Sequence, residues 1–303
     1  MIISITGASG FIGKKLVYAC LNKGYEVRVL SRKKNVNIIG VSIFNANLLD
    51  EHVQFEKFVK GSDIVINCAG DINNTSFMFD LHVKGMSRLL DESIKQGVKR
   101  WIQLSSVGAY GPVRDGIITE KTKENPIGIY EKTKTEADKV IEESGIPYTI
   151  IRPSIVFGSS MKNRSLFQLI EALEKKHFFY IGRDVLVNYV HVDDVVNSIL
   201  LSTSNDLSIG KTYIVSQCLK IEKMIESLLL GLEIKRNIMH LPEPLVRIIF
   251  KVLIIFISKT FTKSRIDALT GRCIYNSSKI EQDLNFRFEK TLEEQFKLFA
   301  IKR

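Results

Sequence analysis

Three polar residues in the middle of the chain have types and spacing suited to moving a proton to or from a substrate oxygen. Tyr130 and Lys134 lie four positions apart, so on a helix their side chains share one face. A free phenol has a pKa of about 10, and a nearby ammonium group favours the phenolate. Ser106 follows an apolar run and can hydrogen-bond the same oxygen. Together they predict an acid–base site, whereas a Tyr-x-x-x-Lys pair alone is also typical of an exposed helical face.

The first thirteen residues predict the element that would bind a nucleotide. Residues 2–5 include three isoleucines, as in a buried parallel strand, and a helical pattern follows until Gly24. Between them, Gly7, Gly10 and Gly13 are spaced G-x-x-G-x-x-G. Such a turn exposes backbone N–H groups at a helix N-terminus, where they favour a pyrophosphate. The alternative is a tight turn that needs glycine for backbone reasons alone.

The second predicted strand, at residues 26–30, bears on the choice between the two nicotinamide dinucleotides. An acidic residue about twenty positions past the glycine turn would bind the ribose 2′-hydroxyl of NAD, whereas an arginine accommodates the 2′-phosphate of NADP. Here Ser31 and Arg32 occupy that place, and Lys33 and Lys34 follow. The sequence therefore predicts NADP(H) in preference to NAD(H), with an ordinary charged surface as the alternative.

Further strands and helices alternate along the first half of the chain. Strand patterns at 41–44, 64–67 and 101–104 are separated by helical patterns at about 55–59 and 79–96. This rhythm predicts a doubly wound parallel sheet, so the expected fold class is α/β, of the Rossmann type.

The composition fits a folded protein with a large core. Of 303 residues, 45% are hydrophobic and 25% are charged, which argues against a long disordered tract. The four cysteines are scattered, without metal-ligand spacing, which favours a reducing setting. A strand that begins at residue 2 leaves no room for a signal peptide, so the expected location is the cytoplasm.

The charge is unevenly distributed. The net charge is +10, and from residue 217 onward 16 Lys and Arg stand against 10 Asp and Glu. No nucleic-acid recognition motif is present, and basic residues do not alternate with aromatic ones in a cluster, so no nucleic-acid partner is predicted. Three explanations of the positive charge remain open: it binds anionic small molecules, it contacts an acidic membrane surface, or it is simply a solvated surface.

The second half of the chain departs from the strand–helix rhythm. Residues 1–155 with 186–216 are predicted to form the dinucleotide-binding domain, and residues 156–185 with 217–303 a smaller, mostly helical substrate lobe.

Two returns to the sheet are expected, at 187–190 and 212–215. Between them, His191, Asp193 and Asp194 have the chemistry of metal ligands. Their spacing instead fits a helix N-terminus whose carboxylates cap the first turn, so no metal site is predicted.

Taken together, these stretches resemble the extended short-chain dehydrogenase/reductase family, and within it the NAD(P)-dependent nucleotide-sugar epimerases, dehydratases and 4-keto reductases. The resemblance covers essentially the whole chain. It is carried by the motifs at residues 6–13, 105–111, 130–134, 151–158 and 190–194.

The resemblance implies a role for each residue of the acid–base site. Tyr130 would be the acid/base, Lys134 would lower the pKa of the phenol and hold the nicotinamide ribose, and Ser106 would position the reacting oxygen. The residues implied in cofactor binding are Gly7, Ser9, Gly10, Phe11, Ile12, Gly13, Arg32, Asn47, Leu48, Cys68, Ala69, Gly70, Tyr130, Lys134, Pro153 and Ser154.

Two residues depart from the pattern of the family. Asn47 stands where an aspartate next to the adenine is common, and His82 stands where an asparagine is common. Both residues keep the capacity to form hydrogen bonds. His82 is expected to be a structural histidine that bonds the backbone, with a second proton donor as the alternative.

The predicted function is that of an NAD(P)-dependent epimerase or reductase acting on a nucleotide-activated sugar, at C4, in the synthesis of glycan precursors. One alternative is a reductase of another hydroxyl or ketone, of the sterol or flavonoid type. A second is a catalytically silent family member that keeps the dinucleotide as a structural or sensing element, although retention of Ser106, Tyr130 and Lys134 argues against it. The sequence leaves the oligomeric state open, with a homodimer as one option.

An unusual apolar stretch spans residues 244–257, interrupted only by Arg247 and Lys251. At about fourteen residues it is shorter than the roughly twenty needed to cross a bilayer. A buried lobe helix or a dimer contact is expected, and a helix lying in the surface of an anionic membrane is the alternative. The positions predicted to be buried are Leu245, Ile248, Ile249, Val252, Ile255 and Phe256.

Overall fold

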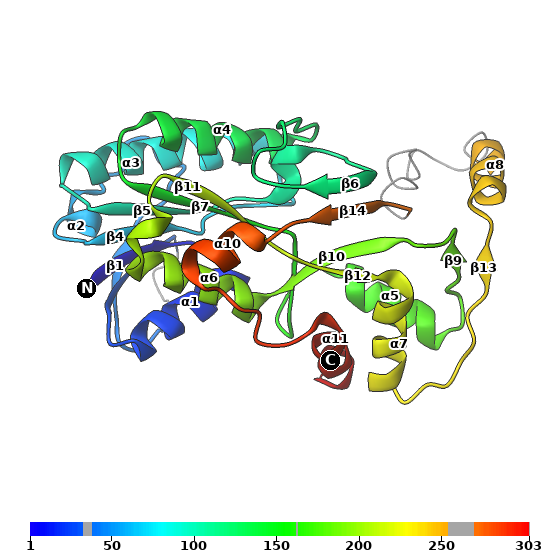
Figure 1. The fold of residues 1–303 in the computed structure, drawn as a ribbon. Helices are drawn as coiled ribbons and strands as arrows, with labels where there is room; N and C mark the ends of the chain where they lie inside the picture. The colour runs from blue at the N-terminus through cyan, green and yellow to red at the C-terminus, as the bar shows by residue number, and fades with distance from the viewer. Residues whose placement is uncertain (33–37, 162, 254–269, 303) are drawn as a thin grey trace.

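A parallel sheet forms the centre of the molecule. The computed structural model describes residues 1–32, 38–161, 163–253 and 270–302, and within these residues the sheet has seven strands in the order β11-β7-β5-β4-β1-β2-β3 (Figure 1). The strands are β1 (Ile2–Thr6), β2 (Glu26–Ser31), β3 (Val41–Asn45), β4 (Ile64–Asn67), β5 (Arg100–Leu104), β7 (Tyr148–Pro153) and β11 (Lys211–Val215). Every neighbouring pair is parallel, so the carboxyl ends of the strands lie along one edge. This confirms the predicted Rossmann-type α/β class.

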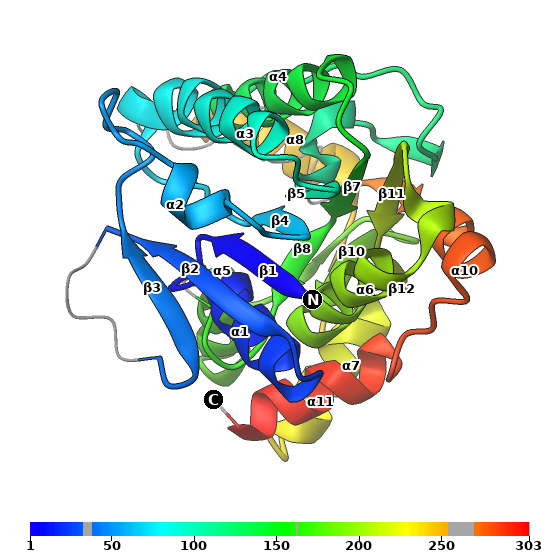
Figure 2. The same ribbon diagram turned by 90° about the vertical axis from the view of Figure 1, so that its left-hand side faces the viewer.

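Helices cover both faces of this sheet (Figure 2). One face packs against α1 (Phe11–Asn22), α6 (Val192–Ser204) and α10 (Ser278–Leu284). The other face packs against α2 (Glu56–Val59), α3 (Met86–Lys95) and α4 (Ile129–Glu143). Ile280 and Leu284 of α10 belong to the same core cluster as Ile3 and Ile5 of β1. A segment from the predicted lobe therefore completes the core of the dinucleotide-binding half, and the division into two domains otherwise stays a prediction.

The helix predicted for residues 79–96 has two parts. It is π-helical over Asp80–Gly85 and continues as α3. Gly85 lies against the backbone of Leu48, which leaves no room for a Cβ. The π-helical turn buries His82, which is 2% exposed.

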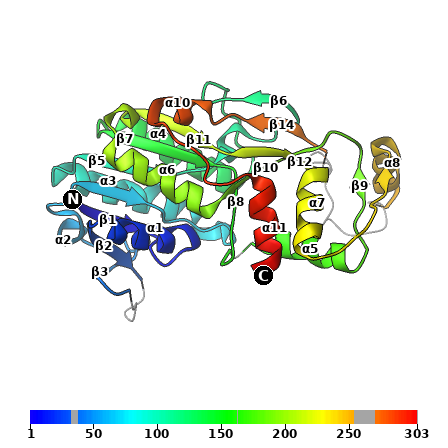
Figure 3. The ribbon, with the colours of Figure 1, turned by 60° about the horizontal axis from the view of Figure 1, so that its bottom comes forward.

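A smaller lobe extends beyond the carboxyl edge of the central sheet (Figures 1 and 3). Its own sheet consists of β8 (Ile155–Phe157), β10 (Leu186–His191) and β12 (Gln217–Lys220), and its helices are α5 (Ser165–Glu174), α7 (Ile221–Gly231) and α11 (Leu292–Lys302). The remaining elements are β6 (Asp115–Ile118) paired with β14 (Arg272–Tyr275), β9 (Tyr180–Ile181) paired with β13 (His240–Leu241), and α8 (Glu243–Leu253). The rings of Phe157 and Phe296 stack in the lobe core with centroids 4.6 Å apart.

One sequence prediction about these segments is wrong. Residues 187–190 were expected in the central sheet but belong to β10, which pairs with β8 and β12. A strand shows the same apolar pattern in either sheet, so periodicity could not identify its neighbours. The region from 217 onward was expected to consist of helices with short connections; it is mostly helical and also contributes the short strands β12, β13 and β14. The second predicted return, at 212–215, is confirmed by β11, which pairs with β7.

The side chains that begin α6 also differ from the prediction. The carboxylates were expected to cap the helix, but His191 is the N-cap, and its Nδ1 accepts the N–H of Asp193 at 3.4 Å. The Asp193 carboxylate pairs with Lys15 of α1 at 2.6 Å, and the Asp194 carboxylate accepts the side-chain amide of Gln295 at 2.9 Å. The two acids therefore connect α6 to other elements of the fold.

Helix α8 exposes residues that the sequence assigns to a core. Val246 is 3% exposed, but Leu245 is 47% and Ile248 is 61% exposed, so the prediction that the latter two are buried is wrong. Outside the described residues lie Ile255 and Phe256, as do the side chains of Ile249 and Val252. Within the described part of the chain, no helix has the length and apolar character needed to cross a membrane.

Candidate active site

The turn between β1 and α1 has the geometry of an anion site. Gly7 has a φ of +67°, in the left-handed region that favours glycine, and a Cβ there would overlap the carbonyl group of Cys68. A Cβ on Gly13 would overlap Gly7 in turn, so glycine lets α1 approach the strand closely. Among the described residues no side chain caps the N-terminus of α1, so the N–H groups of its first turn can bind an anion.

A cavity of about 180 Å³ opens in front of this turn. Nine of the predicted cofactor residues lie on its wall, namely Gly7, Ser9, Gly10, Arg32, Asn47, Leu48, Cys68, Ala69 and Gly70. Phe11, Ile12 and Gly13 form the adjoining first turn of α1. Helix N–H groups, the Arg32 guanidinium and the Asn47 amide are the kinds of group that fit the pyrophosphate, the ribose and the adenine of a dinucleotide.

The other four predicted cofactor residues are not part of this cavity wall. They are Tyr130 and Lys134 of α4, and Pro153 and Ser154 at the carboxyl end of β7. The Ser154 hydroxyl is buried and has no hydrogen-bond partner within the described residues. A buried hydroxyl without a partner is the kind of group that a ligand satisfies.

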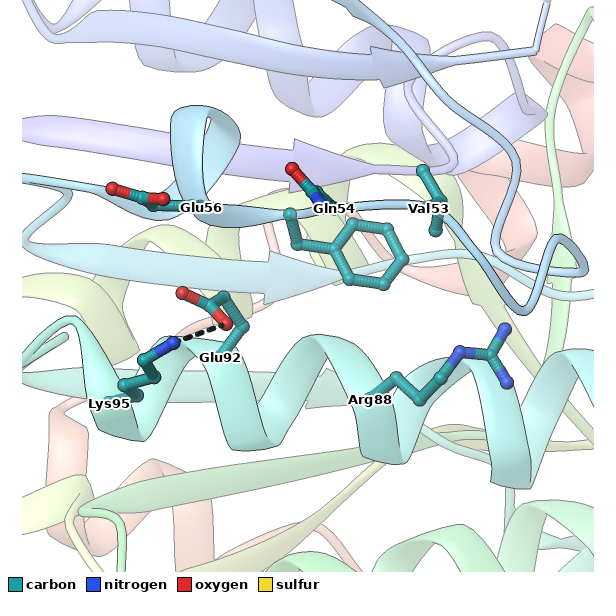
Figure 4. Close-up of a pocket in the computed structure, with 7 residues that line it drawn as sticks. Val53, Gln54, Glu56, Arg88, Glu92 and Lys95 are labelled. Atoms are coloured by element: carbon teal, nitrogen blue, oxygen red, sulfur yellow. Dashed lines mark ion pairs between the residues drawn. The ribbon is translucent and has the colours of Figure 1, made fainter.

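Arg88 of α3 holds the wall of the cavity that carries Asn47 and Leu48. Its Nη2 donates to the carbonyl oxygen of Leu48 at 2.7 Å. Figure 4 shows the surroundings of Arg88, where a hollow of about 290 Å³ is also lined by Glu92 and Lys95. These two residues form an ion pair at 3.8 Å on the surface of the helix. Arg88 thus connects α3 to the loop that follows β3.

Strand β5 and helix α4 hold the three residues of the predicted acid–base site. Ser106 follows β5, and its Oγ accepts the N–H of Gly108 at 3.0 Å, which starts a 3₁₀ turn. Lys134 lies one turn along α4 from Tyr130 and is 4% exposed. Its ammonium donates to the carbonyl of Leu104, the last residue of β5. Leu104 precedes Ser106 by two positions, so this bond fixes α4 beside the strand end that carries the serine.

The pKa of Tyr130 is shifted in the direction opposite to the one that the sequence predicts. Burial raises the pKa of Tyr130 to about 12, and the negative charges of Glu131 and Asp138 add to this shift. Lys134 was expected to lower the pKa of the phenol, but its ammonium bonds the Leu104 carbonyl and desolvation of the phenol dominates. A phenol with a raised pKa is protonated at neutral pH, so Tyr130 is a proton donor in this state.

His82 links the loop after β4 to the turn of α4 that carries Tyr130. Its Nε2 accepts the N–H of Asp71 at 3.1 Å, so the ring proton lies on Nδ1, 2.8 Å from Oγ1 of Thr133. The Thr133 hydroxyl in turn donates to the carbonyl of Tyr130 at 3.1 Å. The rings of His82 and Tyr130 meet edge to face, with centroids 5.7 Å apart. Burial, with a smaller effect of Lys134, lowers the pKa of His82 to about 3. A neutral histidine that bonds backbone agrees with the predicted structural role.

Replacing His82 with Ala should break this link and let the Tyr130 turn shift. A displacement of about 1 Å can cost up to about a hundredfold in rate, so we expect turnover to fall by about tenfold to a hundredfold. The pH profile of turnover should keep its shape between about pH 5.5 and 7.5, because a group with so low a pKa does not titrate there. Steady-state kinetics against pH would measure both. Gln can also accept and donate hydrogen bonds, so His82→Gln should recover part of the turnover. Loss of an ionisation near pH 6.5 in either variant would identify His82 as a proton donor instead.

A buried network behind the site was missed by sequence reasoning. Arg152 donates from Nε and Nη2 to Oδ2 of Asp138 at 3.1 and 2.9 Å, and Ser105 Oγ donates to the same oxygen at 2.6 Å. Glu124 binds Nη2 of the same guanidinium, which lies 5.2 Å from the ring centroid of Tyr110. The network joins β7, α4 and the end of β5. A signal was present in the sequence, since Asp138 lies on the same helical face as the Tyr-x-x-x-Lys pair.

The fold and the site together define a class of enzyme. A Rossmann-type sheet, a glycine turn before α1, and Ser106, Tyr130 and Lys134 around β5 and α4 are the features of the extended short-chain dehydrogenases/reductases. Comparison with protein families matches the NAD dependent epimerase/dehydratase family over residues 3–216. The chain belongs to this family of nicotinamide-dinucleotide enzymes, which confirms the resemblance seen in the sequence.

The chain is similar over most of its length to individual epimerases. A UDP-glucose 4-epimerase of Vibrio cholerae is 26% identical over 98% of this chain and 94% of its own length. The N-acetyl-alpha-D-glucosaminyl-diphospho-ditrans,octacis-undecaprenol 4-epimerase of Escherichia coli O157:H7 is 26% identical over 80% of this chain and 76% of its own length. The solved UDP-glucuronic acid 4-epimerase of Bacillus cereus, in complex with NAD, has a TM-score of 0.76 at 16% identity, covering 100% of this chain and 96% of that one. At that identity the structural likeness shows the shared fold.

Proposed function

We propose that this enzyme reduces or oxidises C4 of a nucleotide-activated sugar, in 4-keto reduction or 4-epimerisation. The observation that carries the proposal is the grouping of Ser106, Tyr130 and Lys134 around the end of β5 and the start of α4. The same edge of the sheet carries the glycine turn and the cavity that fits a dinucleotide. Relatives named as 4-epimerases of nucleotide sugars support C4 as the reacting carbon.

In this proposal Tyr130 and Ser106 act on the oxygen at C4, and Lys134 positions them. The protonated Tyr130 phenol donates its proton to the ketone oxygen during reduction, and the phenolate takes a proton back in the reverse direction. Ser106 Oγ hydrogen-bonds the same oxygen and orients the carbonyl. Lys134, buried one helical turn away, donates to the Leu104 carbonyl and so holds the start of α4 beside Ser106, and its ammonium is proposed to contact the nicotinamide ribose. The dinucleotide, when bound at the glycine turn, supplies or accepts the hydride.

Two measurements test this proposal. The first denatures the purified protein and identifies any released dinucleotide by mass spectrometry, since retained NAD(H) supports epimerisation and an exchangeable cofactor supports net reduction. The second offers a panel of nucleotide sugars and their 4-keto derivatives with NADH and NADPH. Turnover of a non-sugar ketone together with no reaction of any nucleotide sugar would overturn the proposed substrate class.

A sugar carried on a lipid diphosphate is the second candidate substrate. The observation that favours it is the exposure of Leu245 and Ile248 on α8, because a lipid-linked sugar is met only at a membrane surface. One relative is named for such a substrate. A polyprenyl-diphosphate-linked sugar added to the panel separates the two candidates. If the enzyme converts only that compound, the lipid-linked sugar is the substrate and the nucleotide sugar is not.

Arg32 is proposed to select NADP(H). It is exposed on the cavity wall directly after β2, where it can form charge-assisted hydrogen bonds to a 2′-phosphate. Arg32→Ala should weaken NADPH binding by about 1.5 to 3 kcal/mol and leave NADH binding almost unchanged, as measured by titration calorimetry. Lys60→Ala removes an exposed positive charge outside this cavity and should affect neither cofactor. Equal loss of both affinities in Arg32→Ala would contradict the assigned role.

A further inference from the structure

The far end of the lobe joins two segments that are distant in sequence. Residues 175–184 contain β9, and residues 234–248 contain β13 and the first turns of α8. The segments lie side by side because His240 pairs with Tyr180 and Leu241 with Ile181 (Figures 1 and 3). We name these two segments the lobe tip.

Large apolar side chains are exposed on the lobe tip. Met239 is 67%, Ile248 61%, Leu245 47% and Phe179 39% exposed. Phe179 and Met239 immediately precede the paired strands, so the register makes them neighbours. Removing such side chains from water is favourable, and a group of them on one surface indicates a contact.

The lobe tip is also strongly basic. Its two segments carry six basic residues against two acidic ones, the basic ones being Lys175, Lys176, Arg183, Lys235, Arg236 and Arg247 and the acidic ones Asp184 and Glu243. Asp184 pairs with Lys220 at 2.9 Å. Glu243 pairs with Arg247 at 2.8 Å and with Arg114, from outside the lobe tip, at 2.7 Å. Both acidic charges of the two segments are therefore offset, and the segments themselves carry more positive than negative charge.

Contacts on the buried side of α8 determine which of its residues face outward. Val246 is 3% exposed, and Glu243 is held by arginines of the chain on that side. Leu245 and Ile248 are turned away from these contacts by the helical period. The start of the helix is thus anchored to the lobe with apolar side chains facing outward.

We propose that the lobe tip docks on an anionic membrane surface, with Leu245 and Ile248 entering the interface and Lys and Arg residues of its two segments contacting acidic headgroups. Apolar residues beside excess positive charge are the combination that such a surface binds. A second copy of the chain fits less well, because a two-fold contact would bring the same positive charges face to face. This inference does not depend on the proposed function, since membrane binding is measured without substrate.

Sedimentation with lipid vesicles tests the proposal on the full chain. Vesicles that contain phosphatidylglycerol should bind the protein at low salt, and 0.5 M NaCl or vesicles of phosphatidylcholine alone should reduce binding by about tenfold or more. The variant Leu245→Ser/Ile248→Ser should lower the partition coefficient on the anionic vesicles by about tenfold or more. Lys175→Gln/Lys176→Gln should weaken binding by about thirtyfold without changing the apolar residues.

A matched control is Leu207→Ser, which removes an apolar side chain that is 61% exposed, as Ile248 is, from the turn between α6 and β11. This variant should bind vesicles as the unmodified protein does. Circular dichroism and retained nucleotide binding check that every variant is folded. Absence of salt-sensitive binding by the unmodified protein would overturn the proposal, as would equal binding by the α8 double variant. A dimer in light scattering that the α8 double variant dissociates would instead assign the surface to a second copy.

Discussion

Replacing Tyr130 with Phe should lower turnover by about two to four orders of magnitude, the usual contribution of a positioned acid–base group. The phenylalanine ring can keep the edge-to-face contact with His82 at 5.7 Å, so the fold and the affinity for the dinucleotide should change little. Because burial raises the pKa of Tyr130 to about 12, the phenol of the native enzyme stays protonated across neutral pH. Reductive turnover should therefore not decline between about pH 7 and 9 through this group.

Measurement of kcat, KM and cofactor affinity separates the roles of the neighbouring residues. Tyr18→Phe removes a hydroxyl from an exposed position on α1 and should leave turnover unchanged. Lys134→Ala should lower turnover and also weaken dinucleotide binding, because the ammonium is proposed to touch the ribose. Unchanged turnover in Tyr130→Phe would remove this residue from the mechanism.

Replacing Asp138 with Asn should destabilise the fold by about 3 to 5 kcal/mol, because it leaves the guanidinium of a buried arginine without its main counter-charge. Asp138 is 1% exposed and Arg152 is 3% exposed, so water cannot compensate for the lost charge. Glu124 remains beside Arg152, but it does not replace the two bonds to Oδ2. Urea unfolding followed by circular dichroism would measure the free energy of unfolding.

A surface ion pair gives the control for this measurement. Glu226 pairs with Lys223 at 2.8 Å, and the two side chains are 55% and 59% exposed. Glu226→Gln should therefore leave the free energy of unfolding almost unchanged, since solvent screens the pair. Similar losses in the two variants would mean that burial does not set the strength of the Asp138 pair.

Much of the dinucleotide-binding half could be predicted from sequence because its signals are local. The strand ending at Thr6, the glycine turn and the helix after it each depend on residues within about one element of one another. Gly7, Arg32 and Gly70 were predicted separately, and all three line one cavity because each follows a parallel strand. Residues that follow parallel strands lie at the same edge of the sheet, so no long-range information was needed to place them together.

The features that escaped prediction depend on partners far apart in the chain. The pairing of Asp138 with Arg152 joins a helix to a strand, and although the helical period places Asp138 on the face of Tyr130 and Lys134, it does not show which residue of another element pairs with it. The Arg152 guanidinium is held by two carboxylates, Glu124 and Asp138, which come from different parts of the chain. The exposure of Leu245 was missed for a related reason. An apolar pattern shows which side of a helix is apolar, but it does not show whether another element packs against that side.

The return of α10 to the central sheet bears on the order in which the protein can fold during synthesis. Ile280 and Leu284 pack in the same cluster as Ile3 and Ile5, so β1 meets these core neighbours only after the ribosome has also made α10. Until then the nascent sheet exposes apolar surface on that face, where other chains can bind it. Folding of the dinucleotide-binding half therefore waits for a helix that is translated long after the glycine turn.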